Sequence, residues 1–148
     1  MKAIHLINQI VDREKLWKLV GYQPIQQQRD IHSSNARFRI NCQGRRSGKS
    51  YAAAYEILPW LLTPNTRGWI VSPSYNLSQK IARIIKEDIM VKLKLPIAYK
   101  KEVSGDLYYL KLAGLNSELA VKSADSPESL IGDGVDYLVI DEAAALPN

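Results

Sequence analysis

The chain has little cysteine and no long apolar run, and each of these features excludes a class of protein. Its 148 residues include one cysteine, Cys42, so an internal disulfide is excluded, which suits a reducing compartment. No apolar stretch approaches the length that crosses a bilayer, and the N-terminal segment lacks the features of a signal peptide. Internal repeats and low-complexity segments are also missing. We therefore expect a single-core cytoplasmic protein that is neither secreted nor held in a membrane.

The charges are unevenly distributed along the chain. Residues 1–101 hold 18 Lys and Arg against 6 Asp and Glu, a net charge of +12, whereas residues 102–148 hold 2 against 9, a net charge of −7. The basic part includes a close group made of Lys80, Arg83, Lys86, Lys92, Lys94, Lys100 and Lys101. This group fits a polyanion such as DNA, or equally a solvated helix face followed by an exposed loop.

The segment 44–50, Gly-Arg-Arg-Ser-Gly-Lys-Ser, has the composition of a phosphate-binding loop. Residues 38–42 before it alternate like a strand, and residues 51–58 after it are typical of a helix. Such a loop directs backbone N–H groups and the positive end of the helix dipole at one point, which phosphate oxygens fit. Lys49 would then reach the β- and γ-phosphates, and the Ser50 hydroxyl would bind Mg²⁺.

The spacing of this loop departs from the standard phosphate loop. Gln43 holds the position of the first glycine, and Gly44 follows one residue late. A basic loop that merely caps a helix is therefore the alternative. Cys42, at the end of the predicted strand, is expected to pack in the core.

A second motif lies about ninety residues downstream, where the short apolar segment 135–140 ends in Asp141 and Glu142. A carboxylate at the carboxyl end of a strand beside the phosphate loop can hold Mg²⁺, the role expected for Asp141. The adjacent Glu142 can orient and deprotonate the attacking water. The alternative is a pair of solvated acids between a strand and a loop. Both motifs in this order favour binding of a nucleoside triphosphate.

Strand and helix patterns alternate along the rest of the chain. This arrangement predicts an α/β fold with a mainly parallel core sheet interrupted by one hairpin. Gly21 is expected to end the first helix, Pro59 to kink or close the third, and Ser74 or Asn76 to cap the fourth. The predicted helices cover residues 3–20, 26–32, 49–62 and 74–93, and the predicted strands cover 38–42, 68–72, 99–103, 107–112, 118–123 and 135–140.

Four segments together resemble the N-terminal ATPase domain of the large terminase subunit, the DNA-packaging motor of tailed bacteriophages. They are residues 22–32, the loop 44–50, residues 122–132 with their Ser-x-Asp-x-Pro-Glu-x-Leu-x-Gly pattern, and residues 138–144. The resemblance implies a P-loop NTPase of the RecA-like (ASCE) class, a three-layer sandwich with a mainly parallel central sheet. Residues 1–21 would form an N-terminal helix, and residues 22–148 the ATPase core. Loops without the first glycine are common in that family.

The resemblance also implies roles for single residues. Gln28 would read the adenine edge with Tyr22 close to the base, and Gln26 or Gln27 is the alternative if the register differs. Arg45 would act as an arginine finger in cis, with Arg46 as its alternative. The expected nucleotide contacts are Tyr22, Gln28, Gly44, Arg45, Arg46, Ser47, Gly48, Lys49 and Ser50. The expected catalytic residues are Glu142, Arg45 and Lys49, and the expected Mg²⁺ ligands are Ser50 and Asp141.

The function implied is hydrolysis of ATP with Mg²⁺, coupled to movement of double-stranded DNA through a portal ring into a capsid. The implied partners are DNA, a portal protein, a small terminase subunit and further copies of the chain in a ring. The site of action would be the host cell cytoplasm, transiently on the procapsid.

The sequence departs from that family after the two acids, since it ends at Asn148 without the coupling segment or the nuclease domain. We therefore expect a fragment or a truncated product whose acid-tipped strand has an unpaired edge. A helicase-type ATPase, which also uses an upstream glutamine and Asp-Glu-Ala, is one alternative. A nucleotide- or DNA-binding module without turnover is another.

Overall fold

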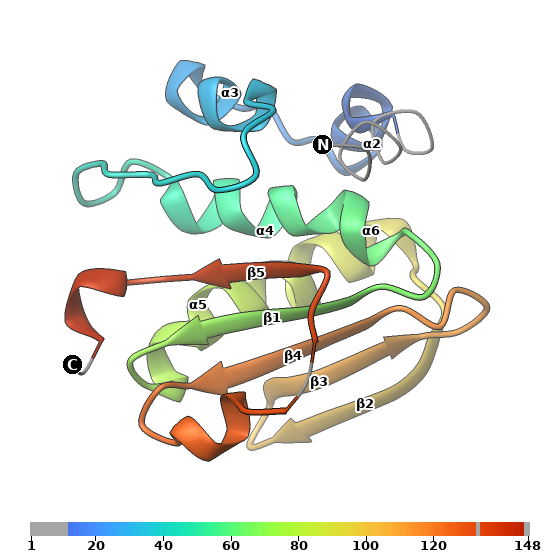
Figure 1. Ribbon diagram of the computed structural model, residues 1–148. Coiled ribbons are helices and arrows are strands. Elements are labelled where there is room, and N and C mark those ends of the chain that lie inside the picture. The colour runs from blue at the N-terminus through green and yellow to red at the C-terminus, as the bar shows by residue number, and fades with distance from the viewer. Residues whose placement is uncertain (1–11, 133, 147–148) are drawn as a thin grey trace.

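The computed structural model describes residues 12–132 and 134–146 (Figure 1). Its helices are α2 (Arg13–Val20), α3 (Gln26–Ser33), α4 (Lys49–Leu61), α5 (Tyr75–Arg83) and α6 (Met90–Leu93), and a π-helical segment, η1 (Ile84–Ile89), joins α5 to α6. The predicted helices are confirmed within these residues, and residues 3–11 of the first one lie outside the described part. None of the described helices is long and apolar enough to cross a membrane.

Local sequence accounts for the ends of two helices. Asp12 caps α2 by accepting a hydrogen bond from the Lys15 backbone, and Gly21 ends it in the left-handed conformation at φ 68°. Helix α4 continues through Pro59 to its last turn. Ser74 is the N-cap residue of α5, although its side chain makes no capping hydrogen bond.

Five strands form one sheet in the order β2-β3-β4-β1-β5. The central strand β1 is parallel to both of its neighbours, and β3 is antiparallel to both of its neighbours. The strands are β1 (Arg67–Ser72), β2 (Ile97–Val103), β3 (Asp106–Leu112), β4 (Glu118–Ser123) and β5 (Tyr137–Ile140). The sheet is therefore mixed rather than mainly parallel, because the predicted β2–β3 hairpin adds two antiparallel pairings to the two parallel ones.

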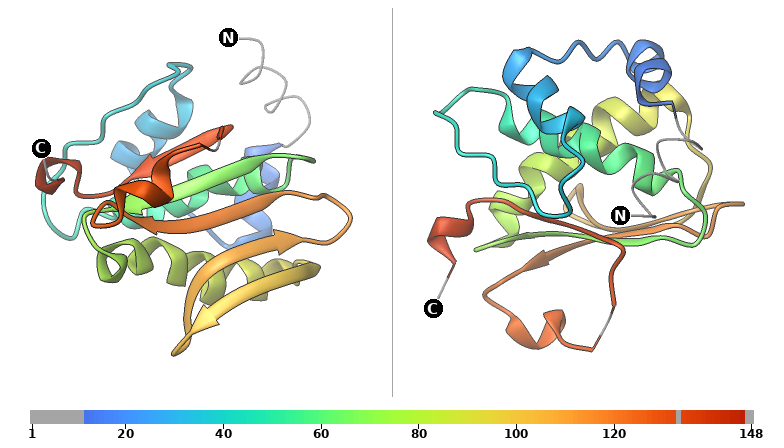
Figure 2. Two further views of the ribbon diagram at one scale, coloured as in Figure 1. Left: turned by 60° about the horizontal axis from the view of Figure 1, so that its bottom comes forward. Right: turned by 45° about the horizontal axis from the view of Figure 1, so that its top comes forward.

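Helices α3 and α2 pack against α4 and α6, respectively, whereas α4 and α5 themselves cover one face of the sheet (Figures 1 and 2). The core between them includes the fully buried side chains of Leu58, Ile81, Ile70 and Leu119. A loop that contains the short 3-10 helix η2 (Pro127–Leu130) lies on the other face of the sheet. Of the three layers expected, the described residues thus form two.

The predicted strand over residues 38–42 is wrong, because this segment is coil between α3 and α4. It keeps the alternation of a strand, but Phe38 and Ile40 are 81% and 87% exposed and Arg39 turns inward. The physical reason is the lack of pairing: residues 38–42 form no ladder with the open edge of β5, and an extended segment without a ladder partner is not a strand. Cys42 is likewise exposed rather than packed in the core.

Candidate functional site

The loop before α4 opens directly onto the N-terminus of that helix. Gly48 is the N-cap residue, with a left-handed φ of 82°, and no side chain caps the first turn. A Cβ atom at Gly48 would lie 2.5 Å from Nε2 of Gln28, so a side chain here would displace the Gln28 amide, and the positive φ also favours glycine. The uncapped first turn leaves backbone N–H groups available to an anion.

Polar groups inside the loop are only partly satisfied. The Lys49 ammonium folds back and donates to the backbone carbonyls of Gln43, at 2.8 Å, and Gly44, at 2.9 Å. Within the described residues, Ser47 Oγ and Gln43 Oε1 are buried without a hydrogen-bond partner. The Ser47 hydroxyl can donate a hydrogen bond to an oxygen-rich ligand, whereas the Gln43 oxygen can only accept one and calls for a donor.

Arg45 and Arg46 are exposed at the tip of the loop. Arg46 has a left-handed φ of 62°, a conformation that costs a non-glycine residue energy. Ser50 is half-buried in the first turn of α4. The choice between Arg45 and Arg46 as the finger stays a prediction, since both guanidinium groups are solvent-accessible.

Asp141 lies where β5 and β1 end together. Its backbone N–H donates to the Val71 carbonyl at 2.9 Å, which continues the parallel pairing, and its Oδ1 accepts from the Glu142 N–H at 3.1 Å. Burial and the Glu142 charge raise the pKa of Asp141, and the charges of Lys80 and Lys49 offset part of this rise. The loop lysine and this distant carboxylate are thus near enough for their charges to interact.

Two further residues stand beside Asp141. Glu142 is exposed in a left-handed conformation, φ 54° and ψ 42°, just before the 3-10 helix η3 (Ala143–Ala145). Lys80 comes from α5, the helix that follows β1. The sequence marked Lys80 only as part of a basic group. The signal that assigns it here is topology, because helices that follow parallel strands begin at the same edge of the sheet.

Most of that basic group is held by acidic partners. The ion pairs are Arg83–Asp106, Lys86–Glu102, Lys92–Asp88 and Lys100–Glu102. These pairs lower the local positive charge, so they favour the alternative of a solvated, ion-paired face over a dedicated polyanion site.

Gln28 is the glutamine of its segment that reaches the loop. It is 5% exposed, its Oε1 accepts from the Ile25 N–H at 3.0 Å, and its Nε2 donates to the Gly48 carbonyl at 3.0 Å. Gln26 and Gln27 are exposed. Because both ends of the Gln28 amide are engaged within the protein, its reading of a base stays a prediction.

Tyr22 belongs to an aromatic stack on α4. Its ring lies parallel to that of Tyr55, with centroids 3.8 Å apart, and both border a cavity of about 540 Å³ together with Tyr51. The Tyr22 hydroxyl lies 3.0 Å from Nε2 of His32. Burial and the nearby Glu56 charge raise the pKa of Tyr22 to about 12, so this hydroxyl remains protonated.

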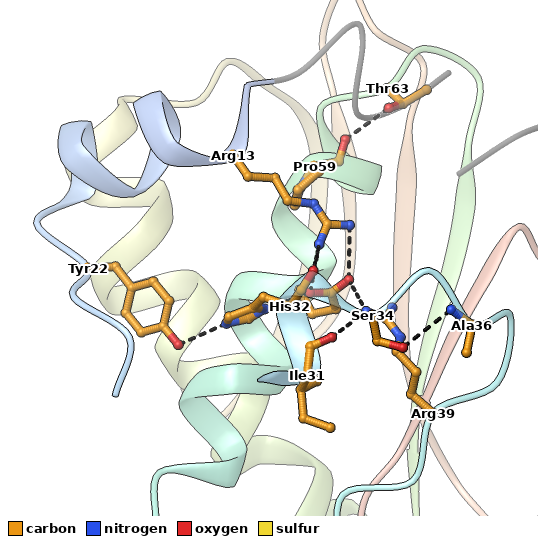
Figure 3. A network of polar contacts seen from close by, with 10 residues as sticks. Arg13, Tyr22, Ile31, His32, Ser34, Ala36, Arg39, Pro59 and Thr63 are labelled. Atoms are coloured by element: carbon orange, nitrogen blue, oxygen red, sulfur yellow. Dashed lines mark hydrogen bonds and ion pairs between the residues drawn. The ribbon is translucent and has the colours of Figure 1, made fainter. Parts of the chain in front are cut away.

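The structure also contains a polar network that the motifs did not predict. Glu56 of α4 contacts Arg13, His32 and Arg39, which come from three other segments (Figure 3). The available signal was one charged residue, Glu56, inside the otherwise uncharged run 52–62. A lone acid at such a position predicts buried ionic partners.

Comparison with known proteins identifies the family to which this chain is similar. Residues 41–148 match the family model of the terminase large subunit, T4likevirus-type, N-terminal. The terminase large subunits of Thermus phage G20c and Thermus virus P23-45 are each 32% identical over 151 residues, which covers 90% of this chain and 30% of theirs. The chain therefore spans less than a third of those relatives.

Solved structures of a terminase ATPase domain are also similar to this chain. The large terminase ATPase domain of Thermus phage P74-26 superposes with a TM-score of 0.77 and 31% identity, over 90% of this chain and 59% of that one. An arginine-to-alanine mutant of that domain gives a TM-score of 0.76 over the same shares. These matches favour a terminase over the helicase alternative. The chain belongs to the phage terminase large subunit family and corresponds to part of its N-terminal ATPase domain.

Proposed function

We propose that this chain binds Mg-ATP at residues 43–50 and hydrolyses it as the ATPase part of a phage DNA-packaging motor. The observation that carries the proposal is the placement of Lys49 in the first turn of α4, directly after the loop, where its charge is among those that act on the pKa of Asp141. An uncapped helix N-terminus and the unpartnered Ser47 hydroxyl lie in the same loop. Membership in the terminase family supports ATP as the nucleotide.

In this proposal the loop N–H groups and Lys49 bind the phosphates, while Ser50 and Asp141 hold Mg²⁺. Within the described residues, no group of three or more His, Cys, Asp and Glu gathers, so the remaining ligands would be phosphate oxygens and water. Mg²⁺ would spread the negative charge of the phosphates as the bond to the γ-phosphate breaks.

The other residues act around this centre. Glu142 orients the attacking water and takes its proton, and its exposure leaves it open to solvent. Arg45, or Arg46, neutralises charge on the γ-phosphate. Gln28 and Tyr22 define the side of the site on which the base binds.

The coupling to DNA is proposed from the family alone, because the chain spans 30% of its curated relatives. The motor would grip the phosphates of double-stranded DNA without reading its sequence, so its binding would weaken steeply with salt. The proposed partners are a portal protein, a small terminase subunit and further copies in a ring, in the host cytoplasm.

Calorimetric titration with Mg-ATP tests the nucleotide site. Wild type should bind, Lys49→Ala should bind at least about a hundredfold more weakly, and Lys111→Met should match wild type. Lys111 is a suitable control because it pairs with Glu118 on the sheet, away from the loop. Equal heats from wild type and Lys49→Ala would overturn the proposal.

A further inference from the structure

Glu56 is a buried acid that none of the proposed chemical steps uses. It is 9% exposed and lies two turns beyond Lys49 on the same helix. Its Oε1 contacts Arg39 Nη1 at 2.7 Å and Arg13 Nη2 at 3.0 Å, and its Oε2 lies 2.6 Å from Nδ1 of His32. The side chains of Arg13, His32 and Arg39 converge here from separate segments (Figure 3).

The electrostatics favour an ionised carboxylate. Burial by itself raises the pKa of Glu56, but the hydrogen bond from His32 and the charges of Arg13 and Arg39 outweigh it and hold the pKa below its usual value. Glu56 is therefore charged at neutral pH, and each of its three contacts is charge-assisted or ionic.

The contact between Glu56 and His32 connects Glu56 to Tyr22, which is proposed to lie close to the base. Nδ1 of His32 donates to the Glu56 carboxylate, which can only accept, and Nε2 of the same ring forms a hydrogen bond with the Tyr22 hydroxyl at 3.0 Å. His32 is 5% exposed, so its ring has little freedom to reorient. Glu56 thus fixes the hydroxyl end of Tyr22, whose ring stacks on Tyr55 one residue before Glu56.

The contacts of Glu56 with Arg39 and Arg13 connect it to the segments that hold the phosphate loop. Arg39 also donates to the Ile31 carbonyl at 3.1 Å, and Arg13 to the His32 carbonyl at 2.9 Å, so both arginines bind the C-terminal turn of α3. Helix α3 carries Gln28, which is proposed to face the base and whose amide also holds the phosphate loop by donating to the Gly48 carbonyl. Arg39 itself lies in the segment that enters the loop.

We propose that Glu56 is a positioning residue for the nucleotide: from α4 it holds Tyr22 for the base, and Arg39 with α3 for the phosphates. The inference rests on the nucleotide site proposed above. Neither the family match nor any sequence motif assigns a role to this acid. A purely structural network would affect folding alone, whereas a positioning network also sets the affinity of the folded protein.

The base side and the phosphate side of the site can be tested separately with two ligands, Mg-ATP and magnesium tripolyphosphate. The second ligand has no base. Arg39→Met removes the contact of Arg39 with Glu56 and should weaken the binding of both ligands about tenfold. Arg39→Lys keeps the charge and should restore part of the lost affinity. Tyr22→Phe removes only the hydroxyl and should weaken Mg-ATP about three- to tenfold without changing tripolyphosphate. Lys111→Met is the matched control for loss of an ion pair.

Glu56→Gln should weaken both ligands, and the double variant with Arg39→Met should lose less than the sum of the single losses. If Glu56→Gln does not fold, Arg39→Met and Tyr22→Phe still decide the question. Dissociation constants within about twofold of wild type for every folded variant, with Lys49→Ala still defective, would overturn the inference and leave the nucleotide site standing. Failure of wild type to bind either ligand would overturn both.

Discussion

Two acidic sites on this chain differ in the charges that surround them. Glu56 is buried among Arg13, His32 and Arg39, and its pKa is lowered. Asp141 is next to a second acid, Glu142, and its pKa is raised, although Lys80 and Lys49 act against the rise. The first site is electrostatically complete, whereas the second still favours an added cation. The difference agrees with the proposed roles, in which Glu56 holds neighbouring residues in place and Asp141 and Glu142 act on Mg²⁺ and water.

The largest expected effect follows from removing the water-orienting acid. Glu142→Gln should lower the rate of ATP hydrolysis by about 10² to 10⁴ while Mg-ATP still binds, because the amide cannot accept the proton. Phosphate release under saturating Mg-ATP measures this, with Glu128→Gln on the η2 helix as the control. Unchanged turnover would remove Glu142 from the mechanism.

Neutralising the two sites should affect stability with different magnitudes. Glu56→Gln should lower the free energy of unfolding by about 3 kcal/mol, because it leaves two arginines without their buried counter-charge. Asp141→Asn should change it by less than about 1 kcal/mol, and upward, because it relieves repulsion from Glu142. Urea unfolding at pH 7 gives both values. Equal losses would erase the distinction between the sites.

The pH dependence of stability should also separate them. A lowered pKa means that the contribution of Glu56 is present at neutral pH and is lost as the pH falls below its ordinary value of 4.5. Asp141, with a raised pKa, contributes in the opposite sense, since protonation favours its folded form. Glu56→Gln should therefore flatten the acid limb of the stability curve, and Asp141→Asn should not. Urea titrations between pH 7 and 3.5 measure the slopes.

The smallest effect is expected at Lys80, which is exposed. Lys80→Met removes one cation near Asp141 and should weaken Mg-ATP about two- to threefold, because screening by solvent reduces the contribution of an exposed charge. The exposed Lys101, on strand β2, provides the control Lys101→Met. An effect as large as that of Lys49→Ala would mean that Lys80 contacts the phosphates directly.

The sequence predicted those parts of the fold that depend on local patterns. Gly21 ended a helix, the predicted strand over residues 118–123 matched β4 in full, and the predicted strands 99–103 and 107–112 lie within the β2–β3 hairpin. The strand over residues 38–42 failed because strand formation needs a neighbour, which a local pattern does not report. The mixed sheet followed from how the hairpin joined the parallel strands, and this too is a tertiary property.

The site was predictable where a motif carries its own chemistry. The loop residues and Asp141 were named from their types and spacing. Lys80 and Glu56 were not, because their roles depend on which elements pack together in space. The charge of Lys80 acts on the pKa of Asp141 because β1 and β5 are parallel neighbours, and Glu56 meets partners from three separate segments.

The most direct test of the account is the Mg²⁺ dependence of ATP binding, measured by calorimetry for wild type and Asp141→Asn. If the loop and Asp141 form one site, Mg²⁺ should tighten ATP binding to wild type about tenfold and leave Asp141→Asn nearly unchanged. An equal response to Mg²⁺ in both proteins would show that Asp141 holds no metal and would contradict the account.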